Sequence, residues 1–81
     1  MLPDIIEVEI LDDYKLFLRF GDGVSGQIDI SKIISFQGIF AKLKDKKYFD
    51  TVSINRDIGT IFWKNGADIA PCTLYSRIEK S

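Results

Sequence analysis

The side chains best suited to chemistry lie close together near the C-terminus of this 81-residue sequence, at Trp63, Asn65 and Asp68. An indole, an amide and a carboxylate so near each other would suit the binding or turnover of a small molecule. Trp63 and Asp68 also have structural explanations. A strand tryptophan mostly supplies core packing area, and an Asp ahead of Pro71 suits a helix cap. The residue types favour the structural explanations, and the ligand site stays as the alternative.

The elements that would position these side chains are a strand, a turn and a helix. Residues 60–63 are β-branched and aromatic, which is typical of a strand on a half-buried sheet. Asn65-Gly66 tolerates positive φ and predicts a turn. Pro71 suits a first helical turn, and Leu74 and Ile78 lie four residues apart on one face. We therefore expect a C-terminal helix capped by the preceding aspartate.

The sequence lacks the residues on which most other catalytic mechanisms depend. The sequence has no His, and its single Cys is Cys72. His is the commonest general base and metal ligand, so its absence removes the Ser-His and Cys-His nucleophile pairs. One Cys can form neither an internal disulfide nor a structural zinc site. We interpret Cys72 as incidental and predict no catalytic residues, no metal and no cofactor.

One basic cluster is present, formed by Lys42, Lys44, Lys46 and Lys47. Such a cluster can contact nucleic acid or an acidic partner. The chain has 11 basic and 12 acidic residues, however, and lacks the basic excess of nucleic-acid binders. We expect no direct nucleic-acid binding and interpret the cluster as the solvated face of a helix pair. Lys42 and Lys46 remain candidate partner contacts.

Length and composition predict one soluble domain over residues 1–81. The hydrophobic fraction of 46% is ordinary for a globular protein and too high for disorder. The N-terminus lacks the basic and apolar blocks of a signal peptide. No apolar run approaches the roughly 20 residues of a membrane helix. We therefore expect a cytoplasmic protein that does not associate with a membrane.

The first part of the chain shows alternating apolar and polar residues, which is typical of strands with one buried face. The predicted strands cover residues 5–10, 14–20 and 24–30. Asp12-Asp13 and Gly21-Asp22-Gly23 supply the turns between them. These strands form a three-stranded antiparallel meander. Ile6, Val8 and Ile10 are expected on the buried face of its first strand.

Short elements complete the predicted fold. Short helical turns are expected over residues 32–35, 39–43 and 46–49, and two further strands over residues 52–54 and 60–63. Ser31 and Asp45 stand where they would cap the first and the last of these helical turns. The chain is thus expected to be α+β. It would have an antiparallel sheet of about five strands, made of the meander, the helical turns and a hairpin, and a C-terminal helix.

Three apolar residues fall on the sheet face opposite to the expected core, namely Ile5, Phe17 and Phe62. Either helices cover that face, or it carries an exposed apolar patch for a partner or a second copy. Phe17 and Phe62 are therefore candidate contacts.

A series of short motifs runs through the whole chain. They are Asp13-Tyr14-Lys15-Leu16, Phe20-Gly21-Asp22-Gly23, Asp29-Ile30, Gly38-Ile39-Phe40 with Leu43 and Phe49, Ile61-Phe62-Trp63, Asn65-Gly66-Ala67-Asp68, and Pro71 with Leu74-Tyr75. In this order the motifs resemble the small bacterial family catalogued as domain of unknown function 2442. The resemblance implies an α+β fold on an antiparallel sheet, similar to the N-terminal domain of certain helix-turn-helix proteins. It supplies no catalytic residues.

The resemblance also implies a genomic arrangement. Members are often encoded beside another small protein, in pairs that look like toxin–antitoxin modules. Some relatives carry a DNA-binding helix-turn-helix after this domain, and this sequence shows none, so we expect no direct operator binding.

Two functions fit these observations. The first is a non-enzymatic interaction module that binds a small protein partner or itself through Phe17, Phe62 or the lysine cluster. The alternative is a small-molecule-binding or enzymatic domain centred on Trp63, Asn65 and Asp68. A concave pocket at that stretch favours the alternative, and a flat apolar surface favours the interaction module.

Overall fold

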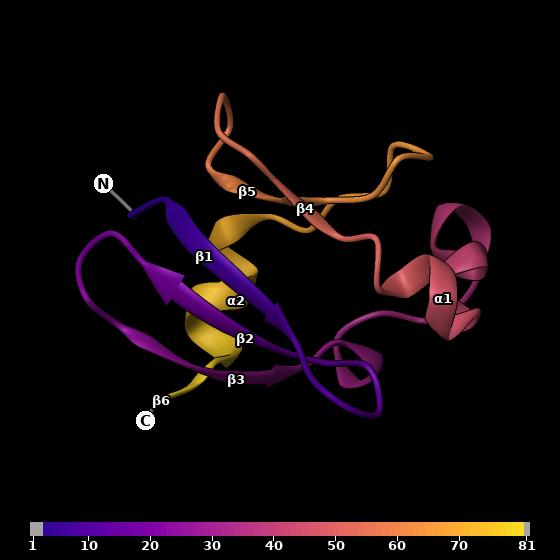
Figure 1. Ribbon diagram of the computed structural model, residues 1–81, viewed down its shortest axis with the longest axis horizontal. Coiled ribbons are helices and arrows are strands. Elements are labelled where there is room, and N and C mark those ends of the chain that lie inside the picture. The colour runs from indigo at the N-terminus through magenta and orange to yellow at the C-terminus, as the bar shows by residue number, and fades with distance from the viewer. Residues whose placement is uncertain (1–2, 81) are drawn as a thin grey trace.

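The computed structural model describes residues 3–80 and has an α+β fold, as the sequence predicts (Figure 1). In chain order the elements are β1 (Ile5–Ile10), β2 (Lys15–Phe20), β3 (Ser25–Asp29), the 3₁₀ helices η1 (Ile30–Lys32) and η2 (Gly38–Lys44), α1 (Lys46–Phe49), β4 (Ser53–Asn55), β5 (Thr60–Phe62), α2 (Pro71–Arg77) and β6 (Glu79–Lys80). The meander, the hairpin and the C-terminal helix are all present. The short strand β6 was not predicted.

The strands form two antiparallel sheets, so the expectation of one sheet is wrong. One sheet has the order β1-β2-β3-β6, and the other contains only β4 and β5. β4 and β5 are three residues long. Their hairpin meets β1 through its loop, where the Ile5 N–H donates to the Gly59 carbonyl oxygen at 3.0 Å. β4 and β5 lie close to β1 but do not pair with it, so the hairpin does not extend the first sheet.

β1 contains a β-bulge at Ile6. Ile5 pairs with Phe20 and Glu7 pairs with Arg19, so two steps along β1 match one step along β2. A bulge inserts one unpaired residue and bends its strand. Ile5 therefore lies in the core, 2% exposed, and Ile6 is 44% exposed. The sequence expectation assigned these two isoleucines to the wrong sides because strict alternation cannot include the extra residue.

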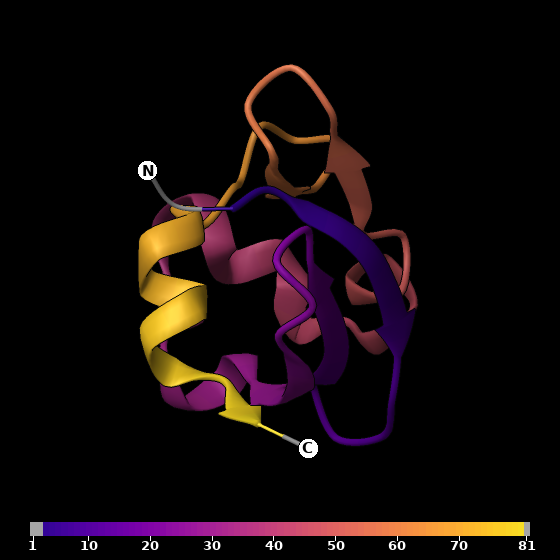
Figure 2. The same ribbon diagram turned by 90° about the vertical axis from the view of Figure 1, so that its left-hand side faces the viewer.

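One side of the four-stranded sheet is covered by the rest of the protein, but the last residue of β1, Ile10, is left exposed on that side. Helix α2 packs against one side of the sheet (Figure 2). Ile10 pairs with Leu16 and shares its side of the sheet. Leu16 is fully buried, whereas Ile10 is 44% exposed. The prediction that Ile10 is buried is wrong, because the layer that covers Ile5 and part of Val8 does not reach the last residue of β1.

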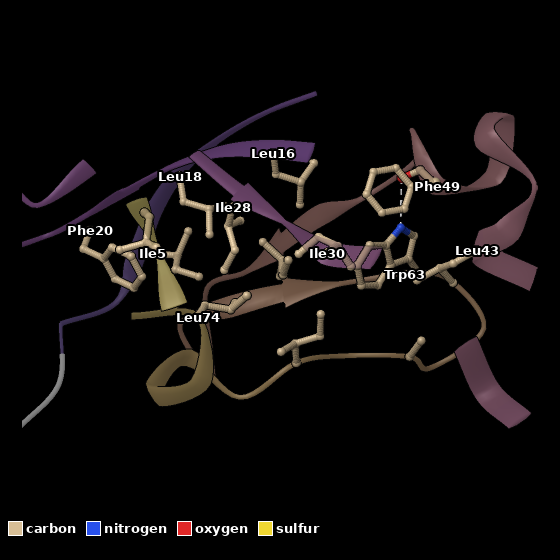
Figure 3. Close-up of a cluster of buried hydrophobic side chains, with 14 residues drawn as sticks. Ile5, Leu16, Leu18, Phe20, Ile28, Ile30, Leu43, Phe49, Trp63 and Leu74 are labelled. Atoms are coloured by element: carbon tan, nitrogen blue, oxygen red, sulfur yellow. Dashed lines mark hydrogen bonds between the residues drawn. The ribbon is translucent and has the colours of Figure 1, made fainter. Parts of the chain in front are cut away.

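A single hydrophobic cluster joins both sheets and α2 (Figure 3). Its buried members are Ile5, Leu16, Leu18, Phe20, Ile28, Ile30, Leu43, Phe49, Ile61, Trp63, Ala67, Ile69, Leu74 and Ile78. Thr60 is also buried, and its hydroxyl donates to the Ile69 carbonyl oxygen at 2.6 Å. Across residues 3–80, no buried side-chain nitrogen or oxygen lacks a hydrogen-bond partner. The core therefore avoids the cost of about 1–3 kcal/mol for each unsatisfied buried group.

Two of the short helices are capped by aspartates. Asp45 caps α1 as predicted, because its side chain accepts from the Lys47 N–H at 3.0 Å. The predicted cap at Ser31 is wrong. The chain becomes helical at Ile30, one residue before Ser31, so Asp29 is the cap and accepts from the Ser31 N–H at 3.0 Å.

Helix α2 begins without a side-chain cap. Its cap position is Ala70, and Pro71 occupies the first turn as predicted. Asp68 is still extended and forms an antiparallel bridge with Phe62. The expected cap at Asp68 is therefore wrong, because the chain continues alongside β5 for two more residues before the helix starts.

Candidate functional site

Trp63 belongs to the core, as the structural explanation predicts. Its side chain is 1% exposed and is the largest of the fully buried side chains. The indole Nε1–H donates to the Phe49 carbonyl oxygen at 2.9 Å, and the Phe49 ring centroid lies 5.7 Å away. Figure 3 shows this hydrogen bond inside the cluster. A ligand cannot reach the indole unless the core opens.

Asn65 holds a turn to a neighbouring helix. Its Nδ2–H donates to the Ile39 carbonyl oxygen in η2 at 2.9 Å, and its Oδ1 accepts from the Ala67 N–H at 3.1 Å. The Gly66 N–H donates to the Trp63 carbonyl oxygen, which closes the turn. The polar atoms of the Asn65 side chain are thus engaged within the chain.

Asp68 lies on the surface, where its backbone bridges to Phe62. Trp63 is enclosed, Asn65 is used in the turn and Asp68 is exposed, so the three side chains do not converge on one site.

Two cavities lie away from this stretch, at the edge formed by β3, β6 and η1. Their volumes are about 100 and 110 Å³, whereas ligand pockets usually measure roughly 300–1,000 Å³. Between them they are lined by Lys15, Gln27, Ile28, Asp29, Lys32, Ile33, Arg77 and Glu79. Both are shallow depressions in a charged edge, and neither includes Trp63, Asn65 or Asp68.

The candidate lysines make contacts within the chain. Lys46 Nζ lies 2.5 Å from Asp50 Oδ1 and also donates to the Leu11 carbonyl oxygen at 3.3 Å. Lys42 Nζ lies 4.8 Å from the centroid of the Tyr48 ring. These contacts hold η2 and α1 in place, so the lysine cluster is not simply a free basic surface.

The uncovered side of the four-stranded sheet brings several predicted residues together. We call it the open face and define it by Glu7, Glu9, Lys15, Phe17, Arg19 and Gln27. The strand register places Phe17 between Glu9 of β1 and Gln27 of β3. Phe17 is half-buried, and the other five residues are exposed. The open face thus has one central aromatic side chain within a charged and polar rim.

The open face carries one cross-strand ion pair among the described residues. Arg19 Nε lies 3.6 Å from Glu7 Oε1, and both side chains are solvent-exposed. An exposed pair of this kind contributes only about 0.2–1 kcal/mol. Its main effect is therefore to fix where charge is presented around Phe17.

The second apolar face expected from the sequence does not exist as one surface. Ile5 enters the core through the bulge, and Phe62 lies on β5, half-buried and paired with Ser53 in the other sheet. Phe17 alone remains on the open face. The structure adds Ile6 and Ile10 as exposed apolar residues on β1. The only sequence signal for this change was the consecutive pair Ile5-Ile6, which interrupts the alternation.

Tyr75 connects α2 to the turn between β2 and β3. Its hydroxyl donates to Asp22 Oδ2 at 2.7 Å, and its ring lies edge-on to Phe20. The hydrogen bond to Asp22 raises the pKa of Tyr75, and burial and the charge of Asp22 raise it further. These contacts hold α2 against β2 and the β2–β3 turn.

Residues 3–80 contain no group of three or more His, Cys, Asp or Glu side chains able to hold a metal ion. Cys72 is exposed in the first turn of α2. Within the same residues, no helix has the length and apolar character needed to cross a membrane.

These features define a small α+β protein with an open sheet face. The family model described as "Protein of unknown function (DUF2442)" matches residues 5–80, so the chain belongs to this family. The motifs running from Asp13 to Tyr75 predicted this membership. Comparison with curated proteins and with solved structures gave no significant match.

Proposed function

We propose that this chain is a non-enzymatic interaction module that binds a small protein partner through the open face. The observation that carries the proposal is the half-buried Phe17 at the centre of that face. Aromatic side chains ringed by polar residues are the usual anchors of protein interfaces. A partner that covered Phe17 would exclude water from it, while the charged rim would select the partner's orientation.

The rim gives the partner a defined chemistry. Glu7 and Glu9 lie toward the β1 side of Phe17, and Lys15 and Arg19 flank it along β2. A matching partner surface therefore needs an apolar pocket for the phenyl ring of Phe17. It also needs basic side chains opposite Glu7 and Glu9, and acidic side chains opposite Lys15 and Arg19. The family resemblance suggests that such a partner is encoded next to this chain, in a pair similar to toxin–antitoxin modules.

The proposal is tested by affinity capture of the tagged chain at native expression level, followed by mass spectrometry. The matched variants are Phe17→Ala on the open face and Ile39→Ala, which alters a residue 49% exposed outside it. We expect one small protein at about one-to-one with the wild type and with Ile39→Ala, and a loss of at least roughly tenfold with Phe17→Ala.

Purified components then decide the outcome. Titration calorimetry of the captured protein should show the same order of affinities. Equal binding by Phe17→Ala would contradict the open face as the interface. Recovery of no partner by the wild type would contradict the interaction module itself.

A further inference from the structure

β1 is the edge strand of the four-stranded sheet, and no strand within residues 3–80 pairs with its outer edge, although the β4–β5 hairpin lies close to β1. At its start the Ile5 N–H donates to the Gly59 carbonyl oxygen in the β4–β5 loop. Beyond the bulge, residues 8–10 pair only with β2. An edge of this kind presents backbone donors and acceptors that another extended chain can pair with.

The apolar side of this edge is incompletely covered. Val8 and Ile10 pair with Leu18 and Leu16, so they share the core side of the sheet. Both leucines are fully buried, but Val8 is half-buried and Ile10 is 44% exposed. A strand added beside β1 would place alternate side chains on this side, where apolar ones would bury surface of Ile10 and continue the core.

The other side of the edge is acidic. Residues 3–14 carry five acids, and all eleven basic residues of the chain lie at position 15 or beyond. Glu7 is paired with Arg19, whereas Glu9 has no ion-pair partner among the described side chains. A strand added beside β1 would therefore meet carboxylates on the open-face side, and basic residues there would complement them.

The same charges disfavour a second copy as the occupant. Two β1 strands paired antiparallel about Val8 would place Glu7 opposite Glu9 twice. Like charges directly opposite each other destabilise a strand pair. The acidic side thus distinguishes a basic partner from self-pairing.

We propose that the edge of β1 binds an extended segment of a partner protein by strand addition, and that this segment alternates Lys or Arg with β-branched apolar residues. The basic side chains face Glu7 and Glu9, and the apolar ones face Val8 and Ile10. Backbone pairing supplies affinity in this recognition mode, and alternate side chains supply specificity. The inference rests on the proposed function, since it names the chemistry of the partner.

The test uses the whole chain, labelled with ¹⁵N, and a blocked peptide that alternates Lys and Val. We expect amide shift changes concentrated at residues 6–10 on titration. A peptide that alternates Glu and Val should cause none of these changes. Glu9→Lys should weaken binding of the basic peptide roughly tenfold, because it replaces attraction with repulsion.

A second pair of variants tests the apolar side. Ile10→Lys should abolish the shifts, and Ile39→Lys should leave them unchanged, because the two isoleucines have similar exposure but only Ile10 lies on the edge. Both positions are exposed, so both variants should fold.

The possible results separate the two proposals. Shifts confined to the surroundings of Phe17, or no shifts at millimolar peptide, would overturn strand addition and leave the open-face interface standing. The peptide could also bind at the edge while affinity capture recovers no partner. That result would support β1 as a site of strand addition and contradict the proposed function.

Discussion

At the scale of single residues, Trp63 has the largest influence on stability. It is the largest of the fully buried side chains and donates a hydrogen bond to the Phe49 carbonyl oxygen. Trp63→Ala should lower the free energy of unfolding by about 3–5 kcal/mol, which approaches the whole stability of a small domain. Urea denaturation followed by circular dichroism measures the loss.

Trp63→Phe is the matched control for this substitution. It keeps an aromatic ring in the core but leaves the Phe49 carbonyl oxygen without its donor, which costs about 1–3 kcal/mol. A Trp63→Ala protein with an unchanged urea midpoint would show that the tryptophan does not support the core.

Gly59 combines a positive φ of 70° with a close neighbour. A Cβ at Gly59 would lie 2.2 Å from Asp4 Oδ1, whereas a Cβ at Gly23, where φ is 92°, would meet nothing within 4 Å. Gly23→Ala should therefore cost only backbone strain, about 1–2 kcal/mol, and Gly59→Ala should cost more. Urea midpoints of the two variants give the comparison. Equal losses would mean that the Asp4 side chain moves aside freely.

The hydrogen bond from Tyr75 to Asp22 should make the stability of the fold depend on pH in the alkaline range. Because its pKa is raised in the folded state, chiefly by the hydrogen bond to Asp22, the unfolded state loses the phenolic proton first. The stabilisation is therefore complete below about pH 10, the unperturbed value, and disappears as pH rises through the raised pKa. Tyr75→Phe should be less stable than wild type at pH 7. The gap should close above pH 10, and a gap that stays constant with pH would contradict this account.

At the scale of elements, most strands and turns follow from local patterns. The meander was predictable because each strand alternates and because the turns contain Asp12-Asp13 and Gly21-Asp22-Gly23. The bulge at Ile6 was not, since two adjacent isoleucines fit either side of a strand and only packing decides between them. The end of the sheet at β1 was not predictable either, because it depends on how the β4–β5 loop docks at Ile5.

Helix caps were also only partly predictable from the sequence. A capping aspartate and a surface aspartate look alike in sequence, and only the path of the backbone separates Asp45 from Asp68. Asp45→Ala should lower the free energy of unfolding by about 1 kcal/mol, because it removes the hydrogen bond to the Lys47 N–H. Asp68→Ala should change it by less than about 0.5 kcal/mol. Thermal or urea unfolding of both variants measures the difference, and equal effects would argue against the assigned cap at Asp45.

At the scale of the whole molecule, the sequence predicted Phe17 as a candidate contact but not the surface around it. The rim of the open face comes from three strands, so it depends on register, which the sequence specified only approximately. Trp63, Asn65 and Asp68 were grouped as an alternative site because they are close in sequence. The fold places Trp63 in the core, Asn65 in a turn and Asp68 on the surface.

The distribution of charge over the molecule makes a last prediction, about assembly. The exposed edge of β1 would favour self-pairing through Ile10, and Glu7 and Glu9 oppose it by repulsion across the pair. The wild-type chain should therefore sediment as a monomer at micromolar concentration and low salt. Replacing both glutamates with Thr, which keeps strand propensity, should raise the dimer fraction measured by sedimentation velocity.

The control variant replaces Asp57 and Asp68 with Thr, which removes the same charge from residues outside β1. It should stay monomeric, because net charge is not what protects the edge. High salt should partly reproduce the effect of the glutamate replacements in the wild type, since the Debye length falls to about 3 Å at 1 M. A wild-type dimer at low salt, or equal dimerisation by both variants, would show that Glu7 and Glu9 do not prevent self-pairing of β1.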